Sequence, residues 1–279
     1  MGGVDEGLSV AAFYGFHAID DVGALRDTVE ETCAGRSVRG TVLVAPEGVN
    51  ATLAGRRADL EYVIERHFRG FDVKWSSAAP GNPVFQRLKV RRRREIVTFD
   101  RPLNPSTPVG KHVCAATWNA MITDPEVIVL DVRNDYESDI GTFKRATRAA
   151  TGNFRDFPDF VNRELAGARR RPVAMFCTGG IRCEKASAYL LARGFEDVSQ
   201  LDGGILKYLA ETEPADSAFE GECFVFDERV SVTGDLDQGS FELCGNCGRP
   251  VPSGGEASGP FALGLGCPAC QASGRPPKE

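Results

Sequence analysis

A cysteine at the start of a glycine-containing loop carries the clearest chemistry in this sequence. An apolar stretch precedes it, a helical segment from Cys183 to Arg193 follows, and the loop reads Cys177-Thr178-Gly179-Gly180-Ile181-Arg182. The two glycines allow successive backbone N–H groups to turn toward one point, where the positive end of the following helix also lies. We therefore expect Cys177 to ionise easily and act as a nucleophile, with Arg182 beside it. The alternative is an inert cysteine packed at a strand end.

The elements around this loop have the pattern of an α/β domain. Between Ala115 and Glu213, short apolar segments are each followed by a turn and a helical segment. Segments that are apolar throughout are typical of strands in a parallel sheet covered on both faces. The sequence therefore predicts a doubly wound domain over residues 115–215, with strands at Val127–Asp131, Val173–Phe176 and Val198–Leu201.

Residues 1–100 have a different order of elements. The periodicity predicts helices at Asp20–Cys33 and Arg57–Phe68. It predicts strands at Leu8–Tyr14 and Gly40–Ala45, a further strand that ends at Leu53, and a last strand at Val84–Phe99. A βαββαβ order fits a ferredoxin-like (acylphosphatase-like) α+β domain. Three prolines between Arg101 and Pro108 indicate a linker, placed at residues 101–114. Residues 216–279 form a small Cys-rich segment with little periodicity.

A run of basic residues lies in the last predicted strand of the first domain. Six of the eight residues from Arg87 to Arg94 are positively charged. Strand alternation turns Leu88 and Val90 inward and puts four charges on the other face, namely Arg87, Lys89, Arg91 and Arg93. Such a stripe suits RNA phosphates. The alternatives are a solvated face or a charged edge strand that discourages aggregation.

Two CxxC pairs occur in the C-terminal segment. Cys244 and Cys247 are separated from Cys267 and Cys270 by nineteen residues. This spacing is that of a zinc site with four cysteine ligands, in which the metal folds a segment that has few apolar residues. Labile disulfides and free thiols are the alternatives.

Composition excludes some classes of protein. The chain has 279 residues and nine cysteines. Its net charge of −6 argues against a protein that coats nucleic acid non-specifically. We find no membrane-length apolar run, no secretory signal and no glycine pattern for a nicotinamide or flavin dinucleotide. A reducing cytoplasm is the simplest compartment for the free thiols, so we expect a cytoplasmic protein.

The spacing in the cysteine loop separates two thiol chemistries. Four residues lie between Cys177 and Arg182, whereas cysteine phosphatases have five. The shorter loop resembles that of rhodanese sulfurtransferases, whose cysteine carries a persulfide. The segments 130–137, with Gly141 after them, and 198–205 resemble two further rhodanese segments in the expected order.

The resemblance extends to one family over essentially the whole chain. The segments 40–50, 87–97, 131–143, 176–191 and 224–232 are similar to those of the rhodanese-containing tRNA uridine(34) hydroxylases. The chain departs from the family pattern at residues 146–152 and at Gln271. The resemblance implies oxygen-dependent hydroxylation of the wobble uridine to 5-hydroxyuridine, with molecular oxygen as co-substrate, tRNA as partner and Cys177 as catalytic thiol.

Several roles stay open at the level of the sequence. The same Cys177 loop would serve a sulfurtransferase with a persulfide on Cys177, and a binding module would need no turnover. Cys183 is interpreted either as a redox partner of Cys177 or as a small packed side chain. Lys185 is interpreted either as part of the site's electrostatics or as a solvated helix charge.

Overall fold

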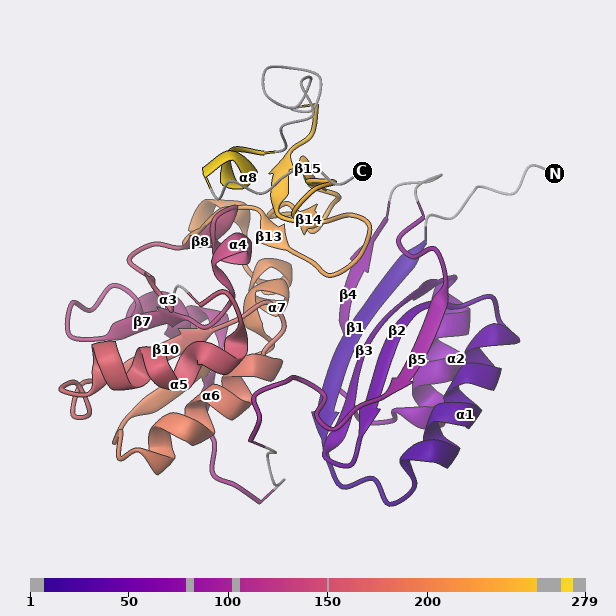
Figure 1. The fold of residues 1–279 in the computed structure, drawn as a ribbon, viewed down its shortest axis with the longest axis horizontal. Coiled ribbons are helices and arrows are strands. Elements are labelled where there is room, and N and C mark those ends of the chain that lie inside the picture. The colour runs from indigo at the N-terminus through magenta and orange to yellow at the C-terminus, as the bar shows by residue number, and fades with distance from the viewer. Residues whose placement is uncertain (1–7, 79–82, 102–105, 150, 255–266, 273–279) are drawn as a thin grey trace.

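The structure is a computed structural model that describes residues 8–78, 83–101, 106–149, 151–254 and 267–272. Parts of the predicted linker and of the Cys-rich segment therefore lie outside the described residues. Two α/β bodies lie side by side, and the C-terminal segment lies across their junction (Figure 1).

The first body has the predicted ferredoxin-like architecture. Its sheet has the strand order β4-β1-β3-β2, with an added edge strand β5 that runs parallel to β2. Two helices cover one face of this sheet (Figure 1). The elements are β1 (Ser9–Phe16), α1 (Val22–Ala34), β2 (Arg39–Ala45), β3 (Gly48–Gly55), α2 (Arg57–His67), β4 (Lys74–Ser77) and β5 (Leu88–Arg92).

One element of that prediction was wrong. The last strand of the βαββαβ unit is β4, a short edge strand beside β1, and not the segment Val84–Phe99. The extended part of Val84–Phe99 is β5, which lies at the opposite edge of the sheet. Strand β4 has only four residues and no buried one, so it lacks the apolar pattern by which strands are recognised.

The two faces of this sheet have different environments. Side chains such as Val42, Val44 and Leu53 are buried against the helices. The opposite face carries partly buried side chains and looks toward the second body, and it includes Thr41, Leu43, Asn50 and Thr52. An antiparallel sheet commonly has one packed face and one open face, and here the open face supplies one wall of a cavity.

The second body is the predicted doubly wound domain, but it begins earlier than predicted, because β6 (Lys111–Val113) belongs to its sheet and lies within the residues assigned to the linker. Its sheet has the order β6-β11-β10-β7-β9, and all of its strand pairs are parallel. The sheet has a hydrophobic core on each face. The core under α5 and α6 includes Phe157 and Leu190. The core under α3 and α7 includes Trp118 and Ile205. The elements are β6 (Lys111–Val113), α3 (Ala115–Met121), β7 (Ile128–Asp131), α4 (Asp135–Ser138), β8 (Gly141–Phe143), β9 (Thr147–Arg148), α5 (Phe157–Phe160), β10 (Val173–Phe176), α6 (Ile181–Ala192), β11 (Val198–Leu201) and α7 (Gly204–Glu211).

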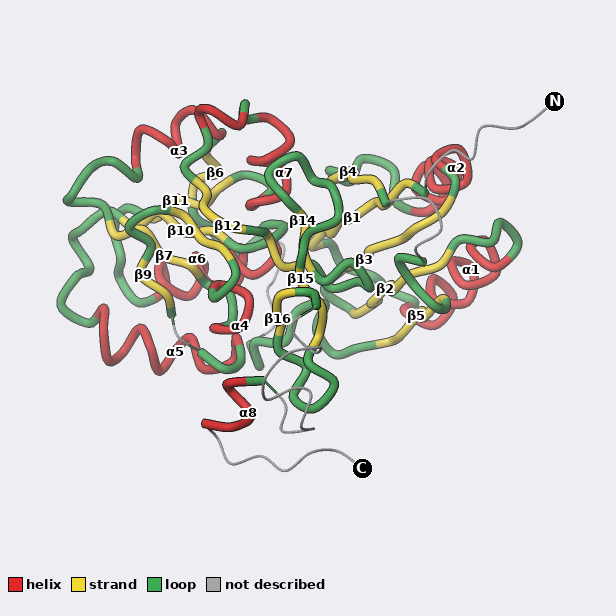
Figure 2. The backbone as a smooth tube through the Cα atoms, turned by 90° about the horizontal axis from the view of Figure 1, so that it is seen from above, coloured by secondary structure: helices red, strands yellow, loops and turns green. Residues whose placement is uncertain are grey.

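The C-terminal segment joins both bodies. It pairs β12 with β8 of the second body, and Arg229 donates hydrogen bonds to Ser76 Oγ and Ser77 O of the first. Figure 2 shows its short strands between the two larger sheets. The elements are β12 (Phe219–Gly221), β13 (Cys223–Phe224), β14 (Ser231–Val232), β15 (Phe241–Leu243), β16 (Pro250–Pro252) and α8 (Pro268–Ala272).

A buried ion cluster fixes the two bodies against each other. Lys185 of α6 is 2% exposed, and its Nζ lies 2.8 Å from Glu47 Oε1 and 2.5 Å from Glu95 Oε2. Nζ also donates to Val97 O at 3.0 Å. Glu47 and Glu95 in turn accept backbone N–H groups of the segment 96–100. Lys185 is therefore a structural member of the interface and not a solvated helix charge.

We expect Lys185→Met to destabilise the protein by about 3–5 kcal/mol, because two carboxylates would stay buried without their cation. Urea unfolding of the full chain measures this change. The matched control is Lys144→Met, since Lys144 has a side chain that is 63% exposed and an exposed partner. The control should change the unfolding free energy by no more than about 0.5 kcal/mol. Equal effects of the two substitutions would contradict the role of the cluster.

Candidate active site

The cysteine loop closes at the carboxyl end of β10, where ligands of parallel sheets commonly bind. Gly180 has φ of +100°, which favours glycine, and its N–H donates to Cys177 Sγ at 3.1 Å. The start of α7 closes the loop from behind, because the N–H groups of Ile205 and Leu206 donate to the Cys177 and Thr178 carbonyls. A Cβ on Gly204 would lie 2.5 Å from the Cys177 carbonyl oxygen, so only glycine fits there.

Arg182 is held by a carboxylate that sequence reasoning did not single out. Its two terminal nitrogens donate to Glu137 Oε1 at 2.5 Å and Oε2 at 2.7 Å, and both residues are buried. Glu137 lies in the first turn of α4, where it also accepts the Asn134 N–H in a capping box. A buried bidentate pair of this kind fixes the guanidinium plane beside the thiol. The spacing from Asn134 to Glu137 is the signal that could have found it.

The environment of Cys177 favours its thiolate. Burial alone would raise its pKa. A hydrogen bond from Cys183, the Arg182 charge and backbone N–H groups of the same turn outweigh burial and lower the pKa to about 6. A pKa of about 6 favours the thiolate at neutral pH, and the thiolate is the form of a cysteine that acts as a nucleophile.

Cys183 lies directly behind Cys177 and is fully buried. Burial and the adjacent Cys177 sulfur raise the pKa of Cys183 well above its usual value. The Cys183 thiol therefore stays protonated and donates a hydrogen bond to the Cys177 sulfur. This contact places Cys183, the predicted redox partner, next to the Cys177 sulfur.

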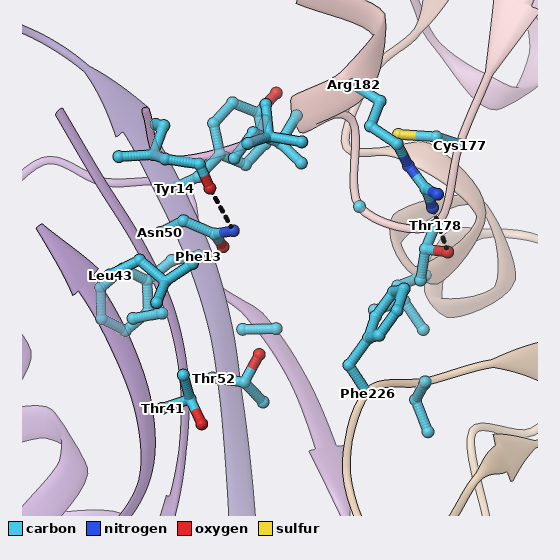
Figure 3. A pocket seen from close by; sticks show the side chains of 18 of the residues that line it. Phe13, Tyr14, Thr41, Leu43, Asn50, Thr52, Cys177, Thr178, Arg182 and Phe226 are labelled. Atoms are coloured by element: carbon cyan, nitrogen blue, oxygen red, sulfur yellow. Dashed lines mark hydrogen bonds between the residues drawn. The ribbon is translucent and has the colours of Figure 1, made fainter. Parts of the chain in front are cut away.

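A cavity of about 460 Å³ opens in front of the loop, between the second body and the open face of the first sheet. Five of the six loop residues line it, together with Arg93 from the basic run; they are Cys177, Thr178, Gly179, Ile181 and Arg182. Figure 3 shows Cys177 and Arg182 on one wall and the strand residues Asn50 and Thr52 on the other. Phe226, from the C-terminal segment, completes the wall below Arg182 (Figure 3).

Tyr14 connects the cavity to a polar network at the interface. Its hydroxyl donates to Glu184 Oε1 at 3.0 Å, and the same oxygen lies 2.9 Å from His112 Nε2. Burial and then Glu184 raise the pKa of Tyr14, so the phenol stays protonated. A Cβ on Gly180 would lie 2.7 Å from this hydroxyl, which places Tyr14 against the cysteine loop.

The basic stripe lies on the edge strand β5 and has the predicted orientation. Leu88 and Val90 pack into the core beneath the helices, so the alternate residues face the same side as the cavity. Arg91 and Arg93 are exposed, and Arg93 lies just past the end of β5. The stripe therefore leads along one edge of the sheet to the cavity.

The four C-terminal cysteines converge. Their sulfur atoms all lie within 4.8 Å of one another, and the pairs 244–270, 267–270 and 247–267 are 3.9, 3.8 and 3.5 Å apart. A tetrahedron with metal–sulfur bonds of ~2.3 Å has edges of about 3.8 Å. None of the described cysteines forms a disulfide. The four thiols thus match a tetrahedral metal site in number, chemistry and spacing.

Comparisons with known proteins agree with this architecture. The profile of the UPF0176 acylphosphatase like domain matches residues 8–96, and that of the rhodanese-like domain matches residues 115–211. A solved rhodanese-like domain from Anabaena is similar to 39% of this chain and 78% of its own, at 24% identity and a TM-score of 0.33. The two profile matches show that the chain combines an acylphosphatase-like domain with a rhodanese-like one.

Curated relatives define the family more narrowly. A protein from Mesorhizobium japonicum is 48% identical over 94% of this chain and 86% of its own, and one from Picosynechococcus is 44% identical over 94% and 89%. One from Teredinibacter turnerae is 43% identical over 94% and 83%. All three are named tRNA uridine(34) hydroxylase. This chain belongs to that family. Within its described residues, no helix is long and apolar enough to span a membrane.

We expect alkylation of Cys177 by iodoacetamide to reach half its maximal rate near pH 6, because the thiolate is the reacting form. Cys183→Ala should move this midpoint to higher pH by removing a hydrogen-bond donor. Rates come from mass spectrometry of the peptide that contains Cys177. Cys33→Ala, in the core of the first domain, should leave the midpoint unchanged. A wild-type midpoint near pH 9, the ordinary value for a cysteine, would contradict the thiolate.

Proposed function

We propose that this protein hydroxylates uridine at the wobble position 34 of tRNA to give 5-hydroxyuridine, with Cys177 as the catalytic thiol. The observation that carries the proposal is Cys177, in surroundings that favour its thiolate, at the wall of a cavity between an open sheet face and a rhodanese-like loop. The names of the curated relatives support the same reaction. A tRNA substrate and a thiol that works in its reduced form favour the cytoplasm as its location.

The thiolate would make C5 of the uracil reactive. Addition of Cys177 sulfur to C6 forms a C–S bond and moves electron density to C5 and O4, as in other covalent catalysis by thiols. The backbone N–H groups of the loop and the Arg182 guanidinium offer positive charge to the oxyanion of this adduct. Molecular oxygen supplies one atom to C5, and the other leaves as water with two electrons and two protons from a thiol reductant. Loss of the C5 proton and of the Cys177 thiolate then restores the ring.

Glu137 and Cys183 would be positioning residues in this scheme. Glu137 orients Arg182. The Cys183 thiol donates a hydrogen bond to the Cys177 thiolate and so stabilises it. We also propose Cys183 as the redox partner that forms a disulfide with Cys177 when Cys177 is oxidised.

Incubation of unmodified tRNA with the protein in air and a thiol reductant should add one oxygen to the wobble uridine. Cys177→Ser should lower the yield by more than about 100-fold, since removal of a nucleophile has effects of that size or larger. Mass spectrometry of the nucleosides measures both. Cys114→Ser changes an exposed thiol that does not line the cavity and should keep full activity. Normal hydroxylation by Cys177→Ser would overturn the role of the thiol, and sulfur transfer from thiosulfate without hydroxylation would favour a sulfurtransferase.

We further propose that Arg87, Lys89, Arg91 and Arg93 bind tRNA phosphates. The double variant Arg91→Ala/Arg93→Ala should weaken tRNA binding and make it less dependent on salt. Each lost phosphate contact lowers the log–log slope by about 0.9 for duplex or 0.7 for single-stranded RNA. Titrations at several salt concentrations measure the slope. Arg169→Ala/Arg170→Ala removes two exposed charges elsewhere and should keep it. An equal slope for both double variants would make the stripe a solvated face.

The four converging cysteines suit one structural zinc ion, held by Cys244, Cys247, Cys267 and Cys270. When bound, zinc would link α8 to the loop after β15 and leave no open position for substrate. Freshly purified, reduced protein should contain about one zinc per chain, and Cys247→Ser should lose it while Cys114→Ser keeps it. Elemental analysis measures the metal content, and hydrogen exchange of residues 241–254 should rise with a chelator. Zinc near zero in the wild type would refute the site.

A further inference from the structure

Phe226 is the most exposed large apolar side chain among the described residues. It is 59% exposed, and of the four exposed ones it alone lines the cavity. An exposed phenyl ring that forms part of a cavity wall offers a surface for another flat, apolar group.

The Phe226 ring has defined neighbours without a ligand. Phe224 packs edge-on against it with centroids 5.1 Å apart, and the Arg182 guanidinium carbon lies 5.9 Å from its centroid. The next residue, Asp227, forms a buried ion pair with Arg229, which is itself anchored on β4. These contacts restrict the positions open to the ring at the cavity, which lowers the entropy lost when a partner stacks on it.

Asn50 presents a hydrogen-bond acceptor on the opposite wall. Its Nδ2 donates to Ile96 O at 3.1 Å, which sets the orientation of the amide. The Oδ1 atom then has an acceptor's role only, and no described residue donates to it in the structure. A ligand with an N–H on its edge is the natural complement of this atom.

We propose that one unpaired uracil base enters this cavity, stacks on Phe226 and donates its N3–H to Asn50 Oδ1. This inference rests on the proposed function, because it assumes an RNA substrate. N3 and C6 are opposite corners of the pyrimidine ring, and Asn50 and Cys177 lie on opposite walls of the cavity (Figure 3). A base read at N3 by Asn50 therefore turns C6 toward the thiolate.

The same arrangement discriminates between bases. Cytosine has an acceptor at N3, which would face the Asn50 oxygen without a hydrogen bond. The stacking surface itself accepts any base, since every base has an aromatic face. Phe226 thus supplies affinity and Asn50 supplies the preference for uracil.

Stacking is tested by binding of a synthetic RNA hairpin with the anticodon loop sequence, containing uridine or an abasic site at the wobble position. Phe226→Ala should weaken binding of the uridine hairpin by about 10-fold or more, and Phe226→Tyr should restore it. Neither should change binding of the abasic hairpin. The control Tyr62→Ala removes an exposed aromatic ring outside the cavity and should change neither. Equal losses for uridine and abasic hairpins would overturn the stacking role.

The recognition of N3 by Asn50 is tested by changing the base first and the protein second. A hairpin with cytidine or N3-methyluridine at the wobble position should bind the wild type about 10-fold more weakly than one with uridine. Asn50→Ala should bind all three alike, and its thermal melting checks that it folds. Equal binding of the three hairpins by the wild type would overturn the inference. Since these assays need no turnover, a protein that discriminates without hydroxylating refutes the proposed reaction alone.

Discussion

The burial of Lys185 between Glu47 and Glu95 is the constraint on which the site depends. Three charged side chains in the first two turns of α6 have partners outside the helix. Arg182 pairs with Glu137 of α4. Glu184 and Lys185 both contact the first body, at Tyr14 and at Glu47. Each is buried, and a buried charge without its partner is strongly destabilising. The domains therefore meet in one relative position, and the helix that starts at the cysteine loop is the element that sets it.

This constraint explains why the chemistry lies between domains. A rhodanese-like loop by itself offers a thiolate and an anion-binding turn, which suit a small substrate. The open face of the ferredoxin-like sheet adds a second wall, and the cavity between them is within the ~300–1,000 Å³ typical of small-molecule sites. In the proposed reaction a base attached to RNA needs both walls, because one edge of the base is held while the Cys177 thiolate adds to the other.

Local patterns were enough to predict most of the fold and the cysteine loop. The buried strands, the glycine loop and the CxxC pairs each depend on residues close in sequence, and the structure contains all of them. The partners of Lys185 lie 138 and 90 residues away, and Phe226 reaches the cavity from a segment without periodicity. No spacing rule connects such residues, since only the docking of the two domains brings them together. Strand β4 was not predicted for a different reason: it is an edge strand without buried residues and therefore has no apolar pattern.

The C-terminal segment is structurally part of the site and not an appendage. Arg249, two residues after Cys247, forms ion pairs with Asp135 and Asp139, which flank the turn that carries Glu137. The cysteine cluster thereby supports α4, whose Glu137 orients Arg182 beside the thiol. The β13–β14 hairpin of the same segment holds Phe226 at the cavity and reaches the first domain through Arg229. The C-terminal segment therefore contacts both domains and also lines the cavity through Phe226, so the site is built from three parts of the chain.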